Sequence, residues 1–380
     1  MVTFIHFSDT HLGYSNIENQ DENGNNIREY DFYNSFKSIV DDIIKLKPDF
    51  VIHSGDLFHR STPSNRSIVF ANSQINRLSV EGIPFFIIAG NHDLPKSIFT
   101  EPINKIFDEI DNTYSFYDEK YVIIEKENFI IHALPHINNE QKYNEEVKKI
   151  NITNKNKPNI LIMHTSIEKT YLMEELGERI FPKECEVQLK EFAYVALGHW
   201  HTFNHIKNLG NVFYAGSIER ESEKETTKEK GYVLVTIDNK TEVKFIAIKT
   251  RVWEKCSVKE CFKKSSDEIL KEVSDWKINS NVKDAIISLT LEDLLPTQVY
   301  DIPKSKLDEM FCESFYFSYN KINKDTKEVI TSDSSTFDLN EILAEKLKES
   351  FNGEDEFQKA WEITNRHLTQ IEEEEANENQ

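Results

Sequence analysis

The sequence predicts an α/β fold built on a parallel sheet, and two observations support this prediction. First, apolar strand-like runs at 2–8, 49–53 and 84–89 are separated by stretches in which apolar residues recur at helical spacing. Second, each run is followed by Asp, Asn or His, residue types suited to the ligand sites that form at the carboxyl ends of parallel strands. The sequence therefore predicts successive βαβ units whose loops meet at one edge of a sheet.

The helices and later strands follow from local patterns. The first helix carries Phe36, Ile39 and Ile43 on one face and ends before Pro48, and the second spans about 64–80. Further strands are expected as a pair within 121–134 and singly at 159–163, 193–197, 211–215, 231–237 and 243–249. We expect the last three to complete a second sheet, and the polar stretch 140–157 to lie at the periphery.

The organisation changes after residue 250. Residues 251–320 read as a small α+β unit, with a strand at 252–258, a helix at 264–275, a strand at 285–291, and a further helix and strand up to residue 319. The predicted domains are therefore 1–250, the α+β unit at 251–320, a polar linker at 321–335, two amphipathic helices at 336–371 and an acidic tail at 372–380.

Composition limits the class of protein. A chain of 380 residues is long enough for two or three units, and it has no apolar run approaching the ~20 residues that span a bilayer. The N-terminus does not read as a signal peptide, so we expect a cytoplasmic or nuclear protein that is not secreted. Four cysteines without a C-x-x-C pair indicate reduced thiols. The net charge of −21 argues against coating nucleic acid by bulk charge, but bound divalent cations would still permit a nuclease.

Metal-ligand residue types occur at five predicted strand ends. They are Asp9, His11, Asp56, Asn91, His92, His164, His199 and His201. Carboxylate, amide and imidazole donors without thiolate suit Mn, Fe or Zn better than Ca, and a carboxylate such as Asp56 can bridge two ions. A single histidine is more often a packing residue, but five strand ends together predict a dinuclear site. On an extended segment, Asp9 and His11 would point the same way, as would His199 and His201.

These stretches resemble the calcineurin-like metallophosphoesterases. The motifs are Asp-x-His at 9–11, Gly-Asp at 55–56, Gly-Asn-His-Asp at 90–93, His164, and Gly-His-x-His at 198–201. Within that superfamily, the segments 8–13, 54–59 and 214–220 resemble the Mre-eleven/SbcD nuclease subunits of double-strand-break repair, closely over about residues 1–250 and by layout beyond. The resemblance implies a four-layer αββα sandwich, a capping domain at 251–320 and a C-terminal helix pair at 336–371.

The resemblance also implies roles for single residues. One metal ion would be held by Asp9, His11, Asp56 and His201, and the other by Asp56, Asn91, His164 and His199, with Mn²⁺ as the expected ion. His92 would be the general acid and Asp93 would fix its tautomer. His59 would steady the phosphate or the distal DNA strand, although a plain loop imidazole remains its alternative. Other histidines, including His6 and His53, are assigned to packing or solvent.

The function implied is a two-metal DNA phosphodiesterase that processes DNA ends and single-stranded DNA. It would combine Mn-dependent 3′–5′ double-strand exonuclease and single-strand endonuclease activity, form a homodimer, and bind an SbcC-type, SMC-like coiled-coil ATPase through residues 336–371. Candidate phosphate contacts are Arg60, Arg66, Lys96 and Arg220. No membrane partner is expected.

Two alternatives stay open at this point. One is a metallophosphoesterase acting on phosphoproteins or nucleotides, and the other is a non-catalytic scaffold subunit of the ATPase complex. Leu57-Phe58-His59 after Asp56, in place of a phosphatase-like Asp-Arg pair, favours the nuclease over the phosphatase. The presence of every metal and acid position argues against the scaffold. The 251–320 unit could also be an accessory domain without substrate contact, and the helix pair could fold back on its own domain.

Overall fold

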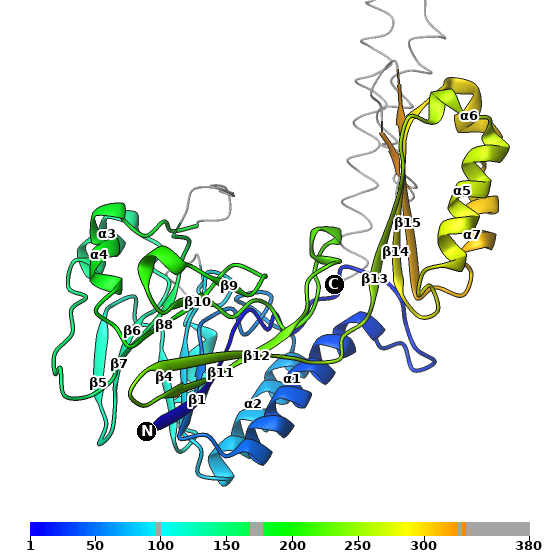
Figure 1. Cartoon of the computed structure of the whole chain (residues 1–380). Helices are drawn as coiled ribbons and strands as arrows, with labels where there is room; N and C mark the ends of the chain where they lie inside the picture. Colours follow the sequence, from blue (N-terminus) through cyan, green and yellow to red (C-terminus); the bar gives the residue numbers. More distant parts are fainter. Residues whose placement is uncertain (96–99, 168–177, 325–328, 332–380) are drawn as a thin grey trace, which may run out of the picture. The chain divides into compact units, whose positions relative to one another are not determined.

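A computed structural model describes residues 1–95, 100–167, 178–324 and 329–331 (Figure 1). The chain divides into two compact units. The first comprises Met1–Glu254 with the short segments Asn281–Ile286 and Glu313–Tyr316, and the second comprises Lys255–Ser280, Ile287–Cys312 and the described residues from Phe317 onward. The two short segments come from the stretch that the sequence assigned wholly to the α+β unit. The predicted helices at 336–371 and the tail lie outside the described residues.

The first unit contains a six-stranded sheet in the order β12-β11-β1-β2-β3-β4. Its strands are β1 (Val2–Phe7), β2 (Phe50–His53), β3 (Phe85–Ile88), β4 (Thr113–Phe116), β11 (Gly231–Ile237) and β12 (Thr241–Ala247). Strands β1 to β4 are parallel, as the predicted βαβ rhythm requires, and β11 runs antiparallel to β1. The crossovers are α1 (Ile27–Leu46) and α2 (Asn65–Val80), whose N-caps Asn26 and Ser64 accept hydrogen bonds from backbone N–H groups of the first turn.

A second sheet follows the order β5-β6-β7-β8-β10-β9. It is built from β5 (Val122–Glu125), β6 (Ile130–Leu134), β7 (Asn159–His164), β8 (Tyr194–Gly198), β9 (Asn204–His205) and β10 (Val212–Tyr214). Strands β6, β7, β8 and β10 are parallel, and β5 and β9 are antiparallel edges. The helices α3 (Glu140–Val147) and α4 (Glu186–Leu189) accompany this sheet.

The prediction that three late strands complete the second sheet is right for β10 and wrong for β11 and β12. Those two strands extend the first sheet, with Val2 opposite Ile237 and His6 opposite Val233. Alternating apolar residues show that β11 has a buried face, but they do not specify which sheet edge supplies its partner. The local pattern therefore located these strands without determining where they pair.

Three apolar clusters separate four layers in the first unit. One lies between the first sheet and the helices α1 and α2, with Phe7, Phe36 and Ile75 among its buried members. The central cluster joins the two sheets, where the ring of Phe4 packs edge-on to that of Tyr194 at 5.3 Å between centroids. The third cluster packs α3 and α4 against the second sheet and buries Tyr143 and Leu189. This α/β/β/α arrangement is the predicted fold class (Figure 1).

The third sheet has the order β13-β14-β15-β16. Its strands are β13 (Trp253–Val258), β14 (Ile286–Leu294), β15 (Tyr316–Asn323) and β16 (Val329–Thr331), and the accompanying helices are α5 (Ser266–Ile278), α6 (Pro296–Asp301) and α7 (Lys304–Met310). A capping box formed by Ser265 and Glu268 begins α5.

The linker predicted at 321–335 is wrong where the structure describes it, because β16 pairs antiparallel with β15 and Lys321 lies opposite Ile330. The polar residues between the two strands gave that stretch the composition of a linker. Separately, within the described part of the chain, no helix has the length and apolar character needed to span a membrane.

Candidate metal centre

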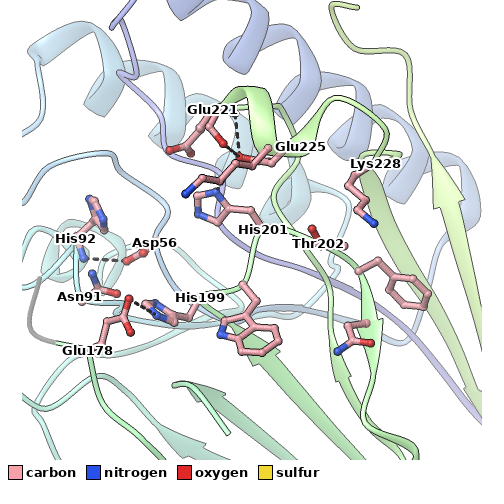
Figure 2. Close-up of a pocket in the computed structure, with 15 residues that line it drawn as sticks. Asp56, Asn91, His92, Glu178, His199, His201, Thr202, Glu221, Glu225 and Lys228 are labelled. Atoms are coloured by element: carbon pink, nitrogen blue, oxygen red, sulfur yellow. Dashed lines mark hydrogen bonds and ion pairs between the residues drawn. The ribbon is translucent and has the colours of Figure 1, made fainter. Parts of the chain in front are cut away.

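The predicted ligand residues meet at the carboxyl edge of the two sheets in the first unit. Asp9 and His11 follow β1, Asp56 follows β2, Asn91 follows β3, His164 ends β7, and His199 follows β8. Asp56, Asn91, His92, His199 and His201 line one cleft, whose volume is about 920 Å³. Figure 2 shows these side chains around the cleft. Each residue is brought there by a short loop at a strand end, which is where parallel sheets form their ligand sites.

The backbone of these loops is left-handed at four of the positions. Asp9, His11, Asp56 and His199 have φ values of 49°, 45°, 56° and 97°. The extended conformation expected for Asp9 to His11 is therefore wrong. The loops are held instead by cross-strand hydrogen bonds, in which the Asp9 N–H donates to the Gly55 carbonyl at 3.0 Å and the His11 N–H donates to the Asp56 carbonyl at 3.1 Å. Such strain in non-glycine residues concentrates at functional sites.

Two glycines allow the loops to approach closely. A Cβ atom on Gly90 would lie 2.0 Å from Asp56 Oδ1, and one on Gly55, whose φ is 101°, would lie 2.4 Å from His164 Nδ1. Neither space can hold a side chain without displacing a predicted ligand. The glycines of Gly-Asp and Gly-Asn-His-Asp thus give the carboxylate and the imidazole room to converge.

The group around His164 fits one metal ion. Its Nδ1 donates to the Ser54 carbonyl at 2.9 Å, which leaves the Nε2 lone pair of the neutral ring facing the cleft. Nε2 lies 2.9 Å from Asn91 Oδ1 and 3.2 Å from Asp56 Oδ2. With that tautomer, three acceptor atoms face one another, and a shared cation would satisfy all of them.

The group around His11 fits a second ion. Ligand atoms of Asp9, His11 and His201 lie within 4.8 Å of one another, and those of Asp9, Asp56 and His164 do as well. His11 is 1% exposed, and neither ring nitrogen has a hydrogen-bond partner among the described residues. Asp56 contacts both groups, since its Oδ2 is 4.0 Å from His11 Nε2. Burial alone would raise the pKa of Asp56, but the positive charge of the His164 and His92 rings, in the protonated form that they take without an ion, holds it well below its usual range.

His92 lies beside the two groups and is held from two directions. Its backbone N–H donates to Asp56 Oδ1 at 2.9 Å, and its Nδ1 donates to the His59 carbonyl at 2.8 Å. The second bond fixes the ring so that Nε2 is left for other interactions. The rings of His92 and His11 are 4.9 Å apart between centroids.

The role expected for Asp93 is wrong in its detail. The Asp93 carboxylate accepts from the backbone N–H groups of Phe58 at 2.9 Å, Gly90 at 3.0 Å and Leu57 at 3.2 Å. It therefore ties the loop after β2 to the loop after β3, and the His59 carbonyl is the group that orients His92. Motif spacing indicated that Asp93 supports the site, but it could not show that backbone amides are its partners.

His59 reaches the same cluster from the loop after β2. Its ring centroid is 5.6 Å from those of both His11 and His92, and the ring packs edge-on to Tyr14 at 5.1 Å. The side chain is half-buried, and its Nδ1 has no hydrogen-bond partner among the described residues. The geometry thus places His59 at the site rather than on a plain surface loop.

Three carboxylates near the site had not been identified from the sequence. Glu178 Oε1 is 3.4 Å from His199 Nε2, Glu221 Oε1 is 3.4 Å from His11 Nε2, and Glu225 Oε1 is 3.5 Å from His201 Nδ1. Acidic partners on the outer nitrogen of metal-binding histidines fix the tautomer, and Glu225, against Nδ1 of His201, is placed for that role. The three carboxylates lie in a chain rich in Glu, so no local signal distinguished them.

A buried lysine supports Glu225. The Lys230 ammonium donates to Glu225, to Ser217 Oγ at 2.7 Å and to the His201 carbonyl at 2.7 Å, and Lys230 is 1% exposed. Burial alone would raise the pKa of Glu225, but the contacts with His201 and Lys230 lower it to about 2. The network therefore keeps an ionised carboxylate against Nδ1 of His201.

Histidines that the sequence assigned to packing are buried near this site. His6 Nδ1 lies 2.9 Å from the Tyr194 hydroxyl and its Nε2 lies 2.8 Å from Ser54 Oγ, while His53 Nε2 lies 2.8 Å from Thr10 Oγ1. Both rings are fully buried. They support the loops that carry the ligands and do not face the cleft.

The candidate phosphate contacts differ in their surroundings. Arg220 donates to Thr250 Oγ1 at 2.7 Å and to the carbonyls of Lys228 and Arg251, so it anchors loops rather than facing the cleft. Arg66 lies 3.4 Å from Glu29, and Lys96 lies outside the described residues. Lys224 and Lys228 line the cleft instead.

The chain is similar to several known proteins. The family model for the calcineurin-like phosphoesterases matches residues 2–203. A DNA double-strand break repair protein Mre11 of Thermoplasma acidophilum is 30% identical, covering 89% of this chain and 88% of the relative. Another Mre11 from Methanococcus maripaludis is 29% identical, covering 91% and 90%. Among solved structures, a dimetal phosphatase from Danio rerio is 11% identical, covers 65% of this chain and 96% of its own, and has a TM-score of 0.41.

Proposed function

This chain belongs to the Mre11 family of calcineurin-like phosphoesterases and is a metal-dependent phosphodiesterase, and we propose that it processes DNA ends with two divalent cations, Mn²⁺ in preference to others. The proposed activities are 3′–5′ exonuclease on duplex DNA and endonuclease on single strands. The observation that supports the chemistry best is the convergence of Asp9, Asp56 and His164, three strand-end residues from two sheets, on one small volume.

The residues divide between two ion positions. Asp9, His11, Asp56 and His201 would hold the first ion, and Asp56, Asn91, His164 and His199 the second. When bound, two such ions can activate a water molecule near neutral pH and offset the charge of the phosphate. Asp56 is the residue that both positions share, because its carboxylate lies within 4.0 Å of ligand nitrogens in both groups.

His92 is proposed as the general acid. Its Nδ1–H is already committed to the His59 carbonyl, so the protonated ring can donate only from Nε2, in this case to the leaving 3′ oxygen. His59 would steady the phosphate from the neighbouring side of the cluster. Asp93 contributes indirectly, by holding the two loops that position Asp56 and His92.

DNA as the substrate rests on family membership and is consistent with the cleft. Lys224 and Lys228 on its wall can contact phosphates beyond the scissile bond, and the volume of about 920 Å³ exceeds what one phosphate needs. The rival activities, on phosphoproteins or nucleotides, would use the same ions but have no need for these extended contacts.

Partners and location complete the proposal. We expect a homodimer and an SMC-like coiled-coil ATPase of the SbcC type bound through residues 336–371, with the protein acting in the cytoplasm or in a nucleus. The 251–320 unit is proposed as a cap that helps to place DNA. Size-exclusion chromatography with light scattering would test the dimer, and a monomer at micromolar concentration would contradict it.

The direct test is cleavage of end-labelled duplex, single-stranded and hairpin DNA with Mn²⁺ or Mg²⁺, alongside a chromogenic phosphodiester, a phosphopeptide and a mononucleotide. We expect Mn-dependent shortening of the duplex and cleavage of the single strand. Hydrolysis of the phosphopeptide or mononucleotide with both DNA substrates intact would overturn the DNA assignment while leaving the metal chemistry standing.

A further inference from the structure

Glu221 places a carboxylate at the metal centre beyond the eight positions identified from the sequence. It follows the segment 214–220 and is separated by Ser222 from the short 3-10 helix Glu223–Glu225. Its side chain lines the cleft with Asp56, and Figure 2 shows it on the same side as Glu225 and His201. The Glu221 side chain is 13% exposed, and that of His11, whose ring it faces, is 1% exposed.

The two facing atoms lack ordinary partners. Glu221 Oε1 and His11 Nε2 lie 3.4 Å apart, and neither atom forms a hydrogen bond with any described residue. Buried polar atoms are rarely left in this state, since each unsatisfied group costs about 1–3 kcal/mol. A buried carboxylate oxygen and a buried imidazole nitrogen that face each other without a hydrogen bond are the arrangement that a cation between them would satisfy.

The backbone of Glu221 is held from both sides. The Tyr14 hydroxyl donates to the Glu221 carbonyl at 2.7 Å, and the Glu221 N–H donates to Glu225 Oε1 at 3.4 Å. Tyr14 also packs against His59, so the same ring contacts two parts of the site. The carboxylate therefore extends from a fixed backbone position toward His11.

The spacing matches that of ligands on one ion. Donor atoms bonded at about 2.0–2.2 Å in neighbouring coordination positions lie about 3 Å apart. His164 Nε2 shows this spacing to Asn91 Oδ1, at 2.9 Å. Glu221 Oε1 and His11 Nε2 are only slightly farther apart, at 3.4 Å. We infer that Glu221 is an additional carboxylate ligand of the ion held by Asp9, His11 and His201, an inference that rests on the proposed two-metal function.

The consequence is an asymmetric pair of sites. The first position would have three carboxylates, from Asp9, Asp56 and Glu221, whereas the second would have Asp56 alone beside an amide and two imidazoles. Oxygen-rich, negatively charged sites favour hard cations such as Mn²⁺ and Mg²⁺. The first position should therefore bind Mn²⁺ more tightly than the second.

The test compares Glu221→Gln and Glu221→Ala with the control Glu229→Gln, which removes an exposed carboxylate from the same loop. Bound Mn²⁺ is measured from the electron paramagnetic resonance signal of the free ion, and water-proton relaxation reports how many waters contact the bound ion. We expect Glu221→Ala to weaken one of two Mn²⁺ ions at least tenfold and to increase relaxation, because water takes the vacated position. Glu229→Gln should match the wild type.

Circular dichroism confirms that each variant is folded, and Glu221→Gln keeps the shape of the side chain if the alanine variant is unstable. Wild-type Mn²⁺ affinity and relaxation in both Glu221 variants would overturn the inference while the two-metal function stands. A wild-type chain that binds no Mn²⁺ would instead overturn the two-metal function itself, so the two failures are distinguishable.

Discussion

At the scale of single residues, His92 and Asp56 are linked although their proposed tasks differ. The His92 N–H donates to Asp56 Oδ1, whereas the His92 ring is oriented by the His59 carbonyl. A change to the His92 ring therefore leaves the backbone bond to Asp56 in place. We expect that one substitution can separate acid catalysis from ion binding.

We expect His92→Ala to retain two Mn²⁺ ions and to cleave duplex DNA about 10²–10⁴ times more slowly, because the substitution removes the proposed proton donor. Elemental analysis measures the ions, and single-turnover cleavage measures the rate. A variant with full metal content and unaltered cleavage would falsify the assignment of His92 as the acid.

Lys230 offers a second prediction at this scale, since it is buried against Glu225 and the His201 carbonyl. Lys230→Met should lower the free energy of unfolding by about 3–5 kcal/mol, because removal of one partner leaves the other charge buried and unpaired. Urea denaturation measures this. Lys228→Met, an exposed change two residues away, is expected within about 0.5 kcal/mol of the wild type.

The loss of stability in Lys230→Met is attributed to the Glu225 carboxylate, which is left buried without its partner. If this is the cause, the double variant Lys230→Met with Glu225→Gln should recover part of the unfolding free energy, as a double-mutant cycle would show. Strictly additive losses would count against the buried pair as the cause. Such a result would leave the packing of the Lys230 stem as the alternative explanation.

Single residues also mark where sequence reasoning succeeds and fails. The metal-ligand residues were identified because they combine the right chemistry with a position directly after an apolar run. Glu178, Glu221 and Glu225 are equally close to the site, but they lie in polar loops and do not follow an apolar run directly, so no local pattern marks them. Asp93 was identified with the wrong partner because spacing does not reveal backbone donors.

At the scale of elements, the site depends on how closely the loops after β2 and β3 approach. Gly90 lies where any Cβ would meet the Asp56 carboxylate and its N–H, at 2.0 and 2.5 Å. The strands deliver the loops to a common edge, but the absence of one side chain sets the final distance. Strand prediction alone therefore explains the location of the site and not its geometry.

We predict that Gly90→Ala lowers bound Mn²⁺ at both positions by at least tenfold, because Asp56 is displaced and both positions share it. The matched control is Gly82→Ala, where nothing lies within 4 Å and the expected cost is only backbone strain at φ +70°, about 1–2 kcal/mol. Titration of both folded variants with Mn²⁺ measures the affinity at each position. Two tightly bound ions in Gly90→Ala would contradict the proposed crowding.

The elements also show which parts of the fold local patterns determine. Helical periodicity and strand runs located α1, α2 and the parallel strands to within a few residues, because each is amphipathic or fully buried over its length. Sheet membership of β11 and β12, and the pairing of β16 with β15, required long-range information. These are contacts whose register is set by partners elsewhere in the chain.

At the scale of the whole molecule, the proposed tasks lie in separate parts of the chain. Every residue assigned to the ions and to acid catalysis belongs to the first unit, whereas the proposed ATPase contact is at 336–371. Loss of the partner should therefore leave the hydrolytic chemistry intact.

A chain ending before residue 336 is expected to lose co-purification with an SMC-like ATPase and to hydrolyse a chromogenic phosphodiester at the rate of the full chain. Pull-down with the ATPase and a colorimetric assay on the same preparation give both readouts. Retained co-purification would refute the docking role of 336–371, and the colorimetric rate shows whether the shortened chain is still folded.

The division of the ligands between the two sheets also has a kinetic consequence. Asp9, Asp56 and Asn91 come from loops of the first sheet, while His164, His199 and His201 come from the second, and the central apolar cluster joins them. Neither sheet alone holds a complete set for either ion. During refolding, tight ion binding should therefore appear only when the two sheets dock. The rate of Mn²⁺ uptake would then measure the rate of that docking step.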